Sequence, residues 1–188
     1  MTKYDPKHAV FLDSDERRKR LPPEEIIELI DLDSSSKIMD LGAGTGFLTF
    51  PLSERVTEGK VYAVDVQKEM LKMLEKKCEE KSCRNIEIVH SNEGQIPISD
   101  RVVDHVFSIN VLHEIKDFET LEEVKRIMKK HADICVVDWD KDVITERGPP
   151  THERFTIQRA INKMKKLGFN IKQKGKFQDH FWLVGNKI

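Results

Sequence analysis

Short apolar runs and longer segments with one apolar side alternate along most of the chain. Five runs rich in apolar and β-branched residues predict strands at 37–41, 61–66, 86–90, 104–110 and 132–139. Two more runs, 170–177 and 180–187, lie so close together that they predict an antiparallel pair. The pattern therefore supplies seven strands, although it leaves their order in space open.

Amphipathic segments between these runs predict helices at 21–32, 47–56, 68–81, 117–128 and 157–167. Pro51 cannot donate a helical hydrogen bond, so the second helix is expected to start late or to bend there. Asp117 is a candidate cap for the fourth helix, whose apolar face would carry Phe118, Leu121, Val124 and Met128. Strands that alternate with helices are typical of a parallel sheet covered on both faces, which binds ligands at the carboxyl ends of its strands.

The composition narrows the class of protein and of partner. The 188 residues carry a net charge of -1, which gives no electrostatic reason to expect nucleic acid or a membrane surface as a partner. Three cysteines without paired spacing predict neither a disulfide framework nor a zinc site. Residues 1–20 are predicted to form a solvated charged arm, and no signal peptide or membrane-spanning run is visible. We expect a cytoplasmic protein with one domain over 1–188, comprising an arm and cap helix at 1–35 and a Rossmann-like core at 36–188.

Three glycines in five positions follow the first predicted strand. Gly42, Gly44 and Gly46 permit backbone angles closed to other residues and let a ligand approach the main chain. A dinucleotide site needs a further glycine at the position of Phe47, and the Gly-Lys-Ser/Thr of a Walker loop is missing. The loop therefore matches neither of these nucleotide sites.

At this loop the sequence resembles motif I of the class I S-adenosylmethionine-dependent methyltransferases. The stretches "DLGAGTG", "VYAVDVQKEML", "HSNEGQIPISDRVVDHVFSINVLHEI" and "LGF" resemble the family's segments, in order, over roughly 36–186. The likeness is to small methyltransferase domains of the quinone-biosynthesis and small-molecule branch. It implies a three-layer, doubly wound α/β fold, in which a mostly parallel seven-stranded sheet has the order 3-2-1-4-5-7-6 and strand 7 is antiparallel. It also implies S-adenosyl-L-methionine as cofactor, methyl transfer by in-line displacement, and no metal.

The resemblance places two acidic residues at the cofactor. Asp65 ends the second predicted strand, where the family binds the ribose hydroxyls, and the alternative is a surface residue that caps the following helix. Asp40 is implied near the methionine amino group, directly or through water. It can also brace the glycine turn, and the two roles are compatible.

The adenine and methionine ends of the cofactor are assigned to later segments. Asn92 stands where relatives often carry an Asp for the adenine amino group; an amide can also accept there, and a simple turn residue is the alternative. Glu93 is implied through its backbone N–H, and Asn110 lies where the family meets the methionine moiety. The other implied cofactor residues belong to the glycine loop and the strand ends: Gly42, Ala43, Gly44, Gly46, Val66 and Leu112.

His113 is the candidate catalytic residue, because an imidazole titrates near neutral pH and this one lies close to the implied methyl position. A packed or loop histidine is an equal alternative. Aromatic walls suit a sulfonium cation or a flat acceptor, although core packing more often explains such residues. The positions considered for the acceptor are Tyr4 and His8 on a lid, Trp139, the loop 148–154 and Phe155.

The chain carries no inserted domain, which suggests a small molecule or an exposed side chain as the acceptor, and we favour the small molecule. The first alternative acceptor is a lysine of another protein. A second alternative is a regulatory protein that binds S-adenosylmethionine without transferring its methyl group. A nicotinamide-dependent reductase is a third, which Phe47 disfavours.

Overall fold

Seven strands form one sheet, and their order determines where ligands can bind. The structure, a computed structural model, describes residues 12–115 and 118–188. The strands are β1 (Lys37–Leu41), β2 (Lys60–Asp65), β3 (Ile86–His90), β4 (Val103–Ile109), β5 (Met128–Trp139), β6 (Phe169–Lys176) and β7 (His180–Lys187). Their order is β3-β2-β1-β4-β5-β7-β6, with β7 antiparallel to β5 and β6, so the predicted topology is confirmed.

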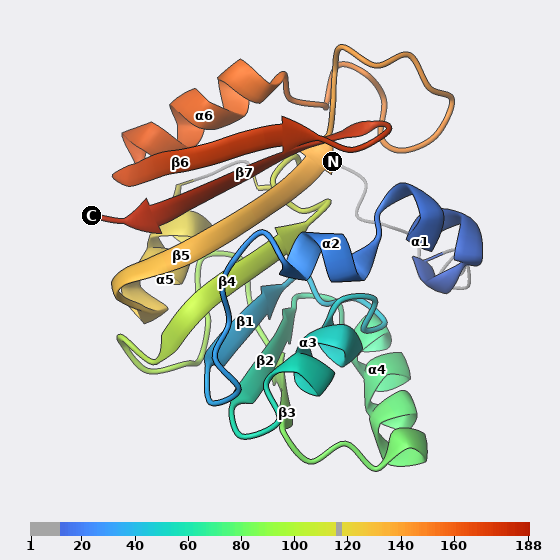
Figure 1. The fold of residues 1–188 in the computed structure, drawn as a ribbon, viewed down its shortest axis with the longest axis vertical. Helices are drawn as coiled ribbons and strands as arrows, with labels where there is room; N and C mark the ends of the chain where they lie inside the picture. The colour runs from blue at the N-terminus through green and yellow to red at the C-terminus, as the bar shows by residue number, and fades with distance from the viewer. Residues whose placement is uncertain (1–11, 116–117) are drawn as a thin grey trace.

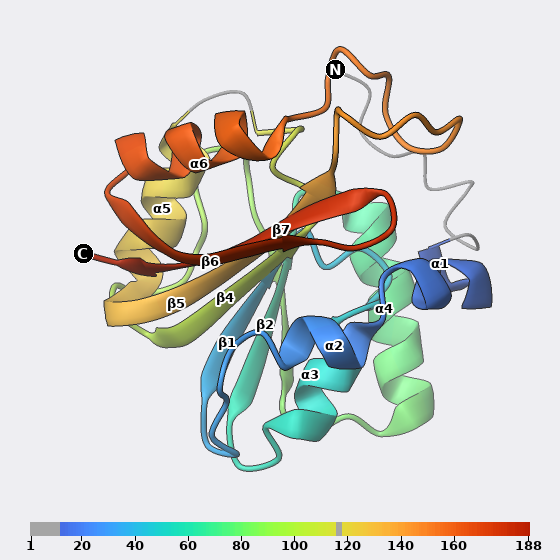
Figure 2. The ribbon, with the colours of Figure 1, turned by 45° about the horizontal axis from the view of Figure 1, so that its top comes forward.

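Helices cover both faces of this sheet (Figures 1 and 2). One face carries three of them: α2 (Pro23–Ile27), α3 (Thr49–Arg55) and α4 (Lys68–Lys81). The other face carries α5 (Glu119–Ile127) and α6 (Ile157–Lys166). Alternate strand residues point to opposite faces, so Ile38 packs with α2 and α3, whereas its neighbour Met39 packs with α5 and α6. The three layers confirm the predicted fold class.

The element bounds follow the sequence wherever its apolar period is strong. β1, β3 and α4 begin and end at the predicted residues. The α3 helix starts late, at Thr49, so Pro51 falls in its first turn, where a missing N–H costs no helical hydrogen bond. The expected effect of Pro51 on this helix is therefore confirmed.

The predicted boundary between the fourth helix and the fifth strand is wrong. The α5 helix ends at Ile127, and β5 begins at Met128 instead of residue 132. The first part of this strand is rich in polar residues and so lacks the apolar pattern that predicts a strand. One of these residues, His131, has a φ of +65°. Phe118 precedes α5 and is 47% exposed, so it does not join the apolar face. The suggested cap, Asp117, lies outside the described residues.

The charged N-terminal run ends in a short helix that has no buried residue, but two of its arginines contact the rest of the chain. This helix is α1 (Asp15–Arg20). The Arg17 guanidinium lies 4.0 Å from the centre of the Phe47 ring. Arg20 pairs with Asp179 at 2.8 Å. These partners come from distant parts of the sequence, which is why the local charge pattern did not reveal them.

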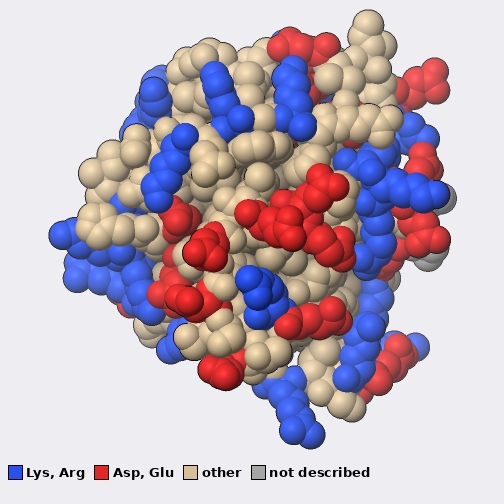
Figure 3. All heavy atoms as spheres, viewed as in Figure 1, with Lys and Arg blue, Asp and Glu red and all other residues tan. Residues whose placement is uncertain are grey.

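Both charge signs occur on the surface. On the face shown in Figure 3, an acidic group over α2 lies between basic groups, in keeping with the net charge of -1. Within the described ranges, no helix combines the length and apolar character that crossing a bilayer requires. The suggested lid residues, Tyr4 and His8, lie outside those ranges.

Candidate active site

A cavity of about 740 Å³ lies at the carboxyl ends of four strands. Its wall includes the last residue of β1, β2, β4 and β5, which are Leu41, Asp65, Ile109 and Trp139. The glycine loop, α1 and the loop after β5 complete it. Sites for small molecules typically enclose roughly 300–1,000 Å³. The cavity therefore has the place and the size expected of a ligand site in this fold.

The glycine loop is pinned against β2 and β4. The N–H groups of Gly42 and Ala43 donate to the Val64 carbonyl at 2.8 and 3.0 Å. Gly42 has a φ of +74°, and a Cβ there would lie 2.1 Å from Val111 Cγ2, so only glycine fits. Gly46 is buried at the base of the loop and does not line the cavity.

Asp65 holds the loop from the side of β2. Its Oδ2 accepts from the Gly44 N–H and its Oδ1 from the Gln67 N–H, both at 2.8 Å. The side chain is buried at the cavity wall and not on the surface, although its hydrogen bond to Gln67, the residue before α4, agrees with the capping role of the alternative. Each carboxylate oxygen can accept a second hydrogen bond, and the role toward ribose hydroxyls stays a prediction.

Asp40 is a buried carboxyl with a raised pKa. Thr49 Oγ1 donates to its Oδ2 at 2.6 Å, which ties β1 to α3. Burial, with a smaller contribution from the charge of Asp65, raises the pKa of Asp40 to about 6 against the opposing effect of the Thr49 hydrogen bond. A cationic ligand group beside Asp40 would reverse this effect.

Two asparagines present amides to the cavity. Asn92 and Gln95 exchange backbone hydrogen bonds at 3.1 and 3.2 Å, so Asn92 is both a turn residue and part of the wall. Asn110 has a φ of +59° at the end of β4, and its N–H donates to the Val137 carbonyl at 2.8 Å. The buried Asn110 Oδ1 has no partner among the described residues, so it is available to a ligand donor.

Most implied cofactor residues line this one cavity. They are Asp40, Gly42, Ala43, Gly44, Asp65, Val66, Asn92, Glu93 and Asn110. Leu112 is an exception, because it is 1% exposed and packs in the core with α5 and α6. Val111 takes its place on the wall.

His113 lies on the same wall and is held by a carboxylate. Its Nδ1 lies 2.7 Å from Asp138 Oδ1, and its backbone N–H donates to Asp138 Oδ2 at 2.9 Å. Burial alone would lower the pKa of His113, but the hydrogen bond and charge of Asp138 raise it overall. A histidine oriented by a buried carboxylate has the arrangement of a general base.

The last two side chains of β5 point to opposite faces of the sheet. Asp138 points toward His113, and the next residue, Trp139, points to the opposite face, where its ring centre lies 4.1 Å from that of His180. Phe155 does not reach this cavity and packs in the core beside His113 and α6. The Trp139 prediction therefore fits the wall, whereas core packing explains Phe155.

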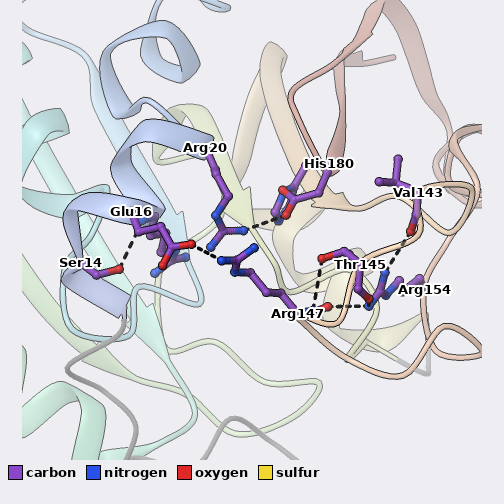
Figure 4. A network of polar contacts seen from close by, with 10 residues as sticks. Ser14, Glu16, Arg20, Val143, Thr145, Arg147, Arg154 and His180 are labelled. Carbon is purple, nitrogen blue, oxygen red and sulfur yellow. Dashed lines mark hydrogen bonds and ion pairs between the residues drawn. The ribbon is translucent and has the colours of Figure 1, made fainter.

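The loop after β5 is shaped by Arg154, which is 2% exposed and does not face a ligand. Its guanidinium donates to the carbonyls of Val143, Thr145, Arg147 and Pro149. Arg147, in turn, forms an ion pair with Glu16 of α1 at the rim (Figure 4). The suggested loop thus belongs to the site, but Arg154 acts on its backbone.

Three functional candidates, Asp138, Arg20 and His180, were not among the predicted site residues. Asp138 had a signal, because a carboxylate inside the apolar run ICVVDW must find a partner when buried. Arg20 and His180 had none, since the link between them runs through Asp179, which lies far from Arg20 in the sequence.

Comparison with known proteins supports one family. Residues 38–131 match the family model described as a methyltransferase domain. A demethylmenaquinone methyltransferase from Geobacillus stearothermophilus is 32% identical over 108 residues, which cover 56% of this chain and 46% of that one. The chain spans about half the length of the demethylmenaquinone methyltransferases it matches.

Solved structures extend the likeness to the whole fold. A SAM-dependent methyltransferase from Aquifex aeolicus has a TM-score of 0.94 and 30% identity, covering 99% of this chain and 100% of that one. The [4+2]-cyclase SpnF has a TM-score of 0.79 at 13% identity, covering 93% and 82%. The second likeness concerns the fold alone, and that protein's name shows that the fold also serves another reaction.

Proposed function

The chain belongs to the methyltransferase-domain family of class I S-adenosylmethionine-dependent enzymes, and we propose that it methylates a small molecule. One observation carries the proposal: a single cavity extends from the glycine loop and Asp65 to the His113–Asp138 pair. One end of this cavity suits the cofactor, and the other brings an acceptor to a base.

The residues at the first end fit S-adenosyl-L-methionine, which supplies an activated methyl group on a sulfonium when bound. Asp40 is a buried carboxyl suited to an ammonium group. The unpartnered Asn110 Oδ1 can accept from the same group. Asp65 is a carboxylate on the cavity wall, and a carboxylate is a suitable acceptor for ribose hydroxyls. The glycine loop lets a ligand approach its backbone at Gly44.

His113 would act on the acceptor. Asp138 can only accept hydrogen bonds when ionised, so it holds the imidazole with its proton on Nδ1. The lone pair of Nε2 is then free to take a proton from an acceptor hydroxyl. Burial of His113 beside the cavity keeps this base at a fixed position, and positioning accounts for much of the rate in such reactions.

Two observations favour a small acceptor over a protein side chain. The cavity is roofed by α1 and by the loop after β5, which the Glu16–Arg147 ion pair joins (Figure 4). The relatives are named for demethylmenaquinone, a ring compound. A flat ring molecule is therefore the first acceptor class to test.

A methyl-transfer screen tests the proposal. The purified chain would be incubated with tritiated-methyl S-adenosylmethionine and a cell lysate divided into low-mass and protein fractions. We expect label in the low-mass fraction, and loss of that label with His113→Asn, which retains a side chain able to donate to Asp138.

Other outcomes would contradict parts of the proposal. Label in the protein fraction would replace the small molecule by a protein acceptor. Binding of S-adenosylmethionine in calorimetry without label in either fraction would favour a regulatory protein. Binding of NADH without binding of S-adenosylmethionine would overturn the choice of cofactor.

A further inference from the structure

Buried polar atoms without partners cluster on the cavity wall. In the described part of the chain, four buried side-chain nitrogens and oxygens have neither a hydrogen-bond nor an ion-pair partner. Three of them belong to residues of this wall: Arg20 Nε, Asn110 Oδ1 and His180 Nε2. Such atoms cost free energy unless a ligand or water satisfies them. Asn110 lies with the implied cofactor residues, whereas Arg20, the last residue of α1, lies with Trp139 and His180.

His180 is fixed by two elements. It is the first residue of β7 and pairs in register with Trp139 of β5, so the two rings meet on one face. Its Nδ1 lies 2.6 Å from Asp179 Oδ1, and Asp179 Oδ2 accepts from Arg20 Nη1 at 2.8 Å. Figure 4 shows Arg20 reaching from α1 toward His180. The ring is fully buried, so its orientation is set before any ligand arrives.

The proton on His180 lies on the Asp179 side. Burial raises the pKa of Asp179, but its hydrogen bonds to His180 and Arg20 lower it overall, so the carboxylate is ionised and can only accept. Burial lowers the pKa of His180 despite the opposing effect of Asp179, so the ring is neutral at neutral pH. Nδ1 therefore carries the single proton, and Nε2 presents a lone pair.

We infer that His180 selects the acceptor by accepting a hydrogen bond at Nε2 from a hydroxyl group on a flat, uncharged ring molecule. This inference rests on the proposed function. Trp139 provides an aromatic surface beside that nitrogen. Arg20 and Arg147 are each paired with a carboxylate, Asp179 and Glu16, which offsets the positive charge that they bring to this wall.

The test compares two ring molecules, only one of which has a hydroxyl group that can donate a hydrogen bond. Binding of 1-naphthol and of 1-methoxynaphthalene would be measured by calorimetry on the full chain saturated with S-adenosylhomocysteine. We expect the wild type to bind 1-naphthol roughly tenfold more tightly, because the methoxy group leaves Nε2 without a donor. His180→Phe keeps a ring but removes Nε2, so this preference should disappear while affinity for S-adenosylhomocysteine is unchanged.

Two variants complete the design. His90→Phe makes the same exchange at an exposed position outside the cavity, and it should retain the preference for 1-naphthol. His180→Gln keeps an amide oxygen as acceptor and should restore part of that preference.

Three results separate the inference from the proposed function. Equal binding of the two probes by the wild type, or none of either, would overturn the inference without any variant. Unchanged 1-naphthol preference in His180→Phe would overturn it as well. Failure of the wild type to bind S-adenosylhomocysteine would instead overturn the proposed function.

Discussion

Asp40 is a buried carboxyl whose charge is stabilised by Thr49 and by the charge of Arg17, but not enough to offset the effect of burial. Its pKa rises from 3.8 to about 6, so the folded chain holds its proton more tightly than the unfolded chain. The stabilisation from that bound proton is complete below pH 3.8 and is lost as the pH rises to about 6. Above that pH, the buried charge of Asp40 lowers the free energy of unfolding of the cofactor-free protein.

Replacing Asp40 by Asn should therefore stabilise the cofactor-free protein. At pH 8 we expect the free energy of unfolding to rise by up to about 3 kcal/mol, and the gain should vanish as the pH approaches 4. Urea unfolding at both pH values measures this, and calorimetry should show weaker S-adenosylhomocysteine binding. A gain independent of pH would show that burial of charge at Asp40 is not the cause.

Asp65 should matter more to binding than to folding. Asp65→Ala removes the acceptor of the Gly44 and Gln67 amides, so we expect at least roughly tenfold weaker binding of S-adenosylhomocysteine. Asp65→Asn keeps one acceptor oxygen, so it should lose less affinity for S-adenosylhomocysteine than Asp65→Ala does. Calorimetry on both variants provides the comparison, and equal affinity of Asp65→Ala and wild type would refute the ribose assignment.

His113 should set the pH dependence of turnover. A base acts in its neutral form, so the rate should rise with pH through a value above the usual 6.5, because Asp138 raises the pKa of His113. Asp138→Asn should shift that limb to lower pH and lower the plateau. Initial rates across pH 5–9, a range spanning about two units either side of neutrality, check this. A rate unaffected by His113→Asn at any pH would exclude the base.

At the scale of elements, the local apolar pattern predicted the bounds of those helices and strands whose own apolar residues pack against the sheet. The bounds of α4 were predictable from the apolar stripe of Met70, Leu71 and Leu74, because these same residues are buried in the structure. The sequence did not reveal α1 as part of the site, because Arg20 meets Asp179 across 159 positions of sequence. Asp138 was missed because its partner, His113, comes from another strand end.

The backbone of the loop after β5 is held in place by the hydrogen bonds of one side chain, Arg154. Arg154→Ala strands four carbonyls, so we expect a loss of roughly 2–4 kcal/mol in stability, a KM for the acceptor several-fold higher, and nearly unchanged binding of S-adenosylhomocysteine. Hydrogen exchange of residues 143–149 should quicken in this variant. Arg159→Ala, on the exposed side of α6, is the matched control. Equal exchange in Arg154→Ala and wild type would contradict this account of the loop.

At the scale of the molecule, strand order and site position follow from general rules, but the acceptor does not. Parallel strands linked by helices bring their carboxyl ends to one edge, so the residues from 40 to 113 meet there without any long-range information. The acceptor wall instead depends on α1 packing beside the antiparallel β7, and no pattern in either segment points to the other.

Ligand binding should stabilise the whole fold. S-adenosylhomocysteine at 100 times its Kd should add about 2.7 kcal/mol to the free energy of unfolding. For a chain of this size that corresponds to a rise in Tm of roughly 5–10 °C. A thermal scan measures it, with NADH at the same concentration as the control. An equal shift with NADH would argue for a nicotinamide site.

The Glu16–Arg147 contact bears on how the site exchanges its contents. Both side chains are more than half exposed, at 61% and 54%, and exposed pairs of this kind contribute about 0–1 kcal/mol. Thermal energy is about 0.6 kcal/mol, so this pair alone adds little to any barrier against opening the rim. We therefore expect the time that a molecule spends inside to depend mainly on its own contacts with the wall.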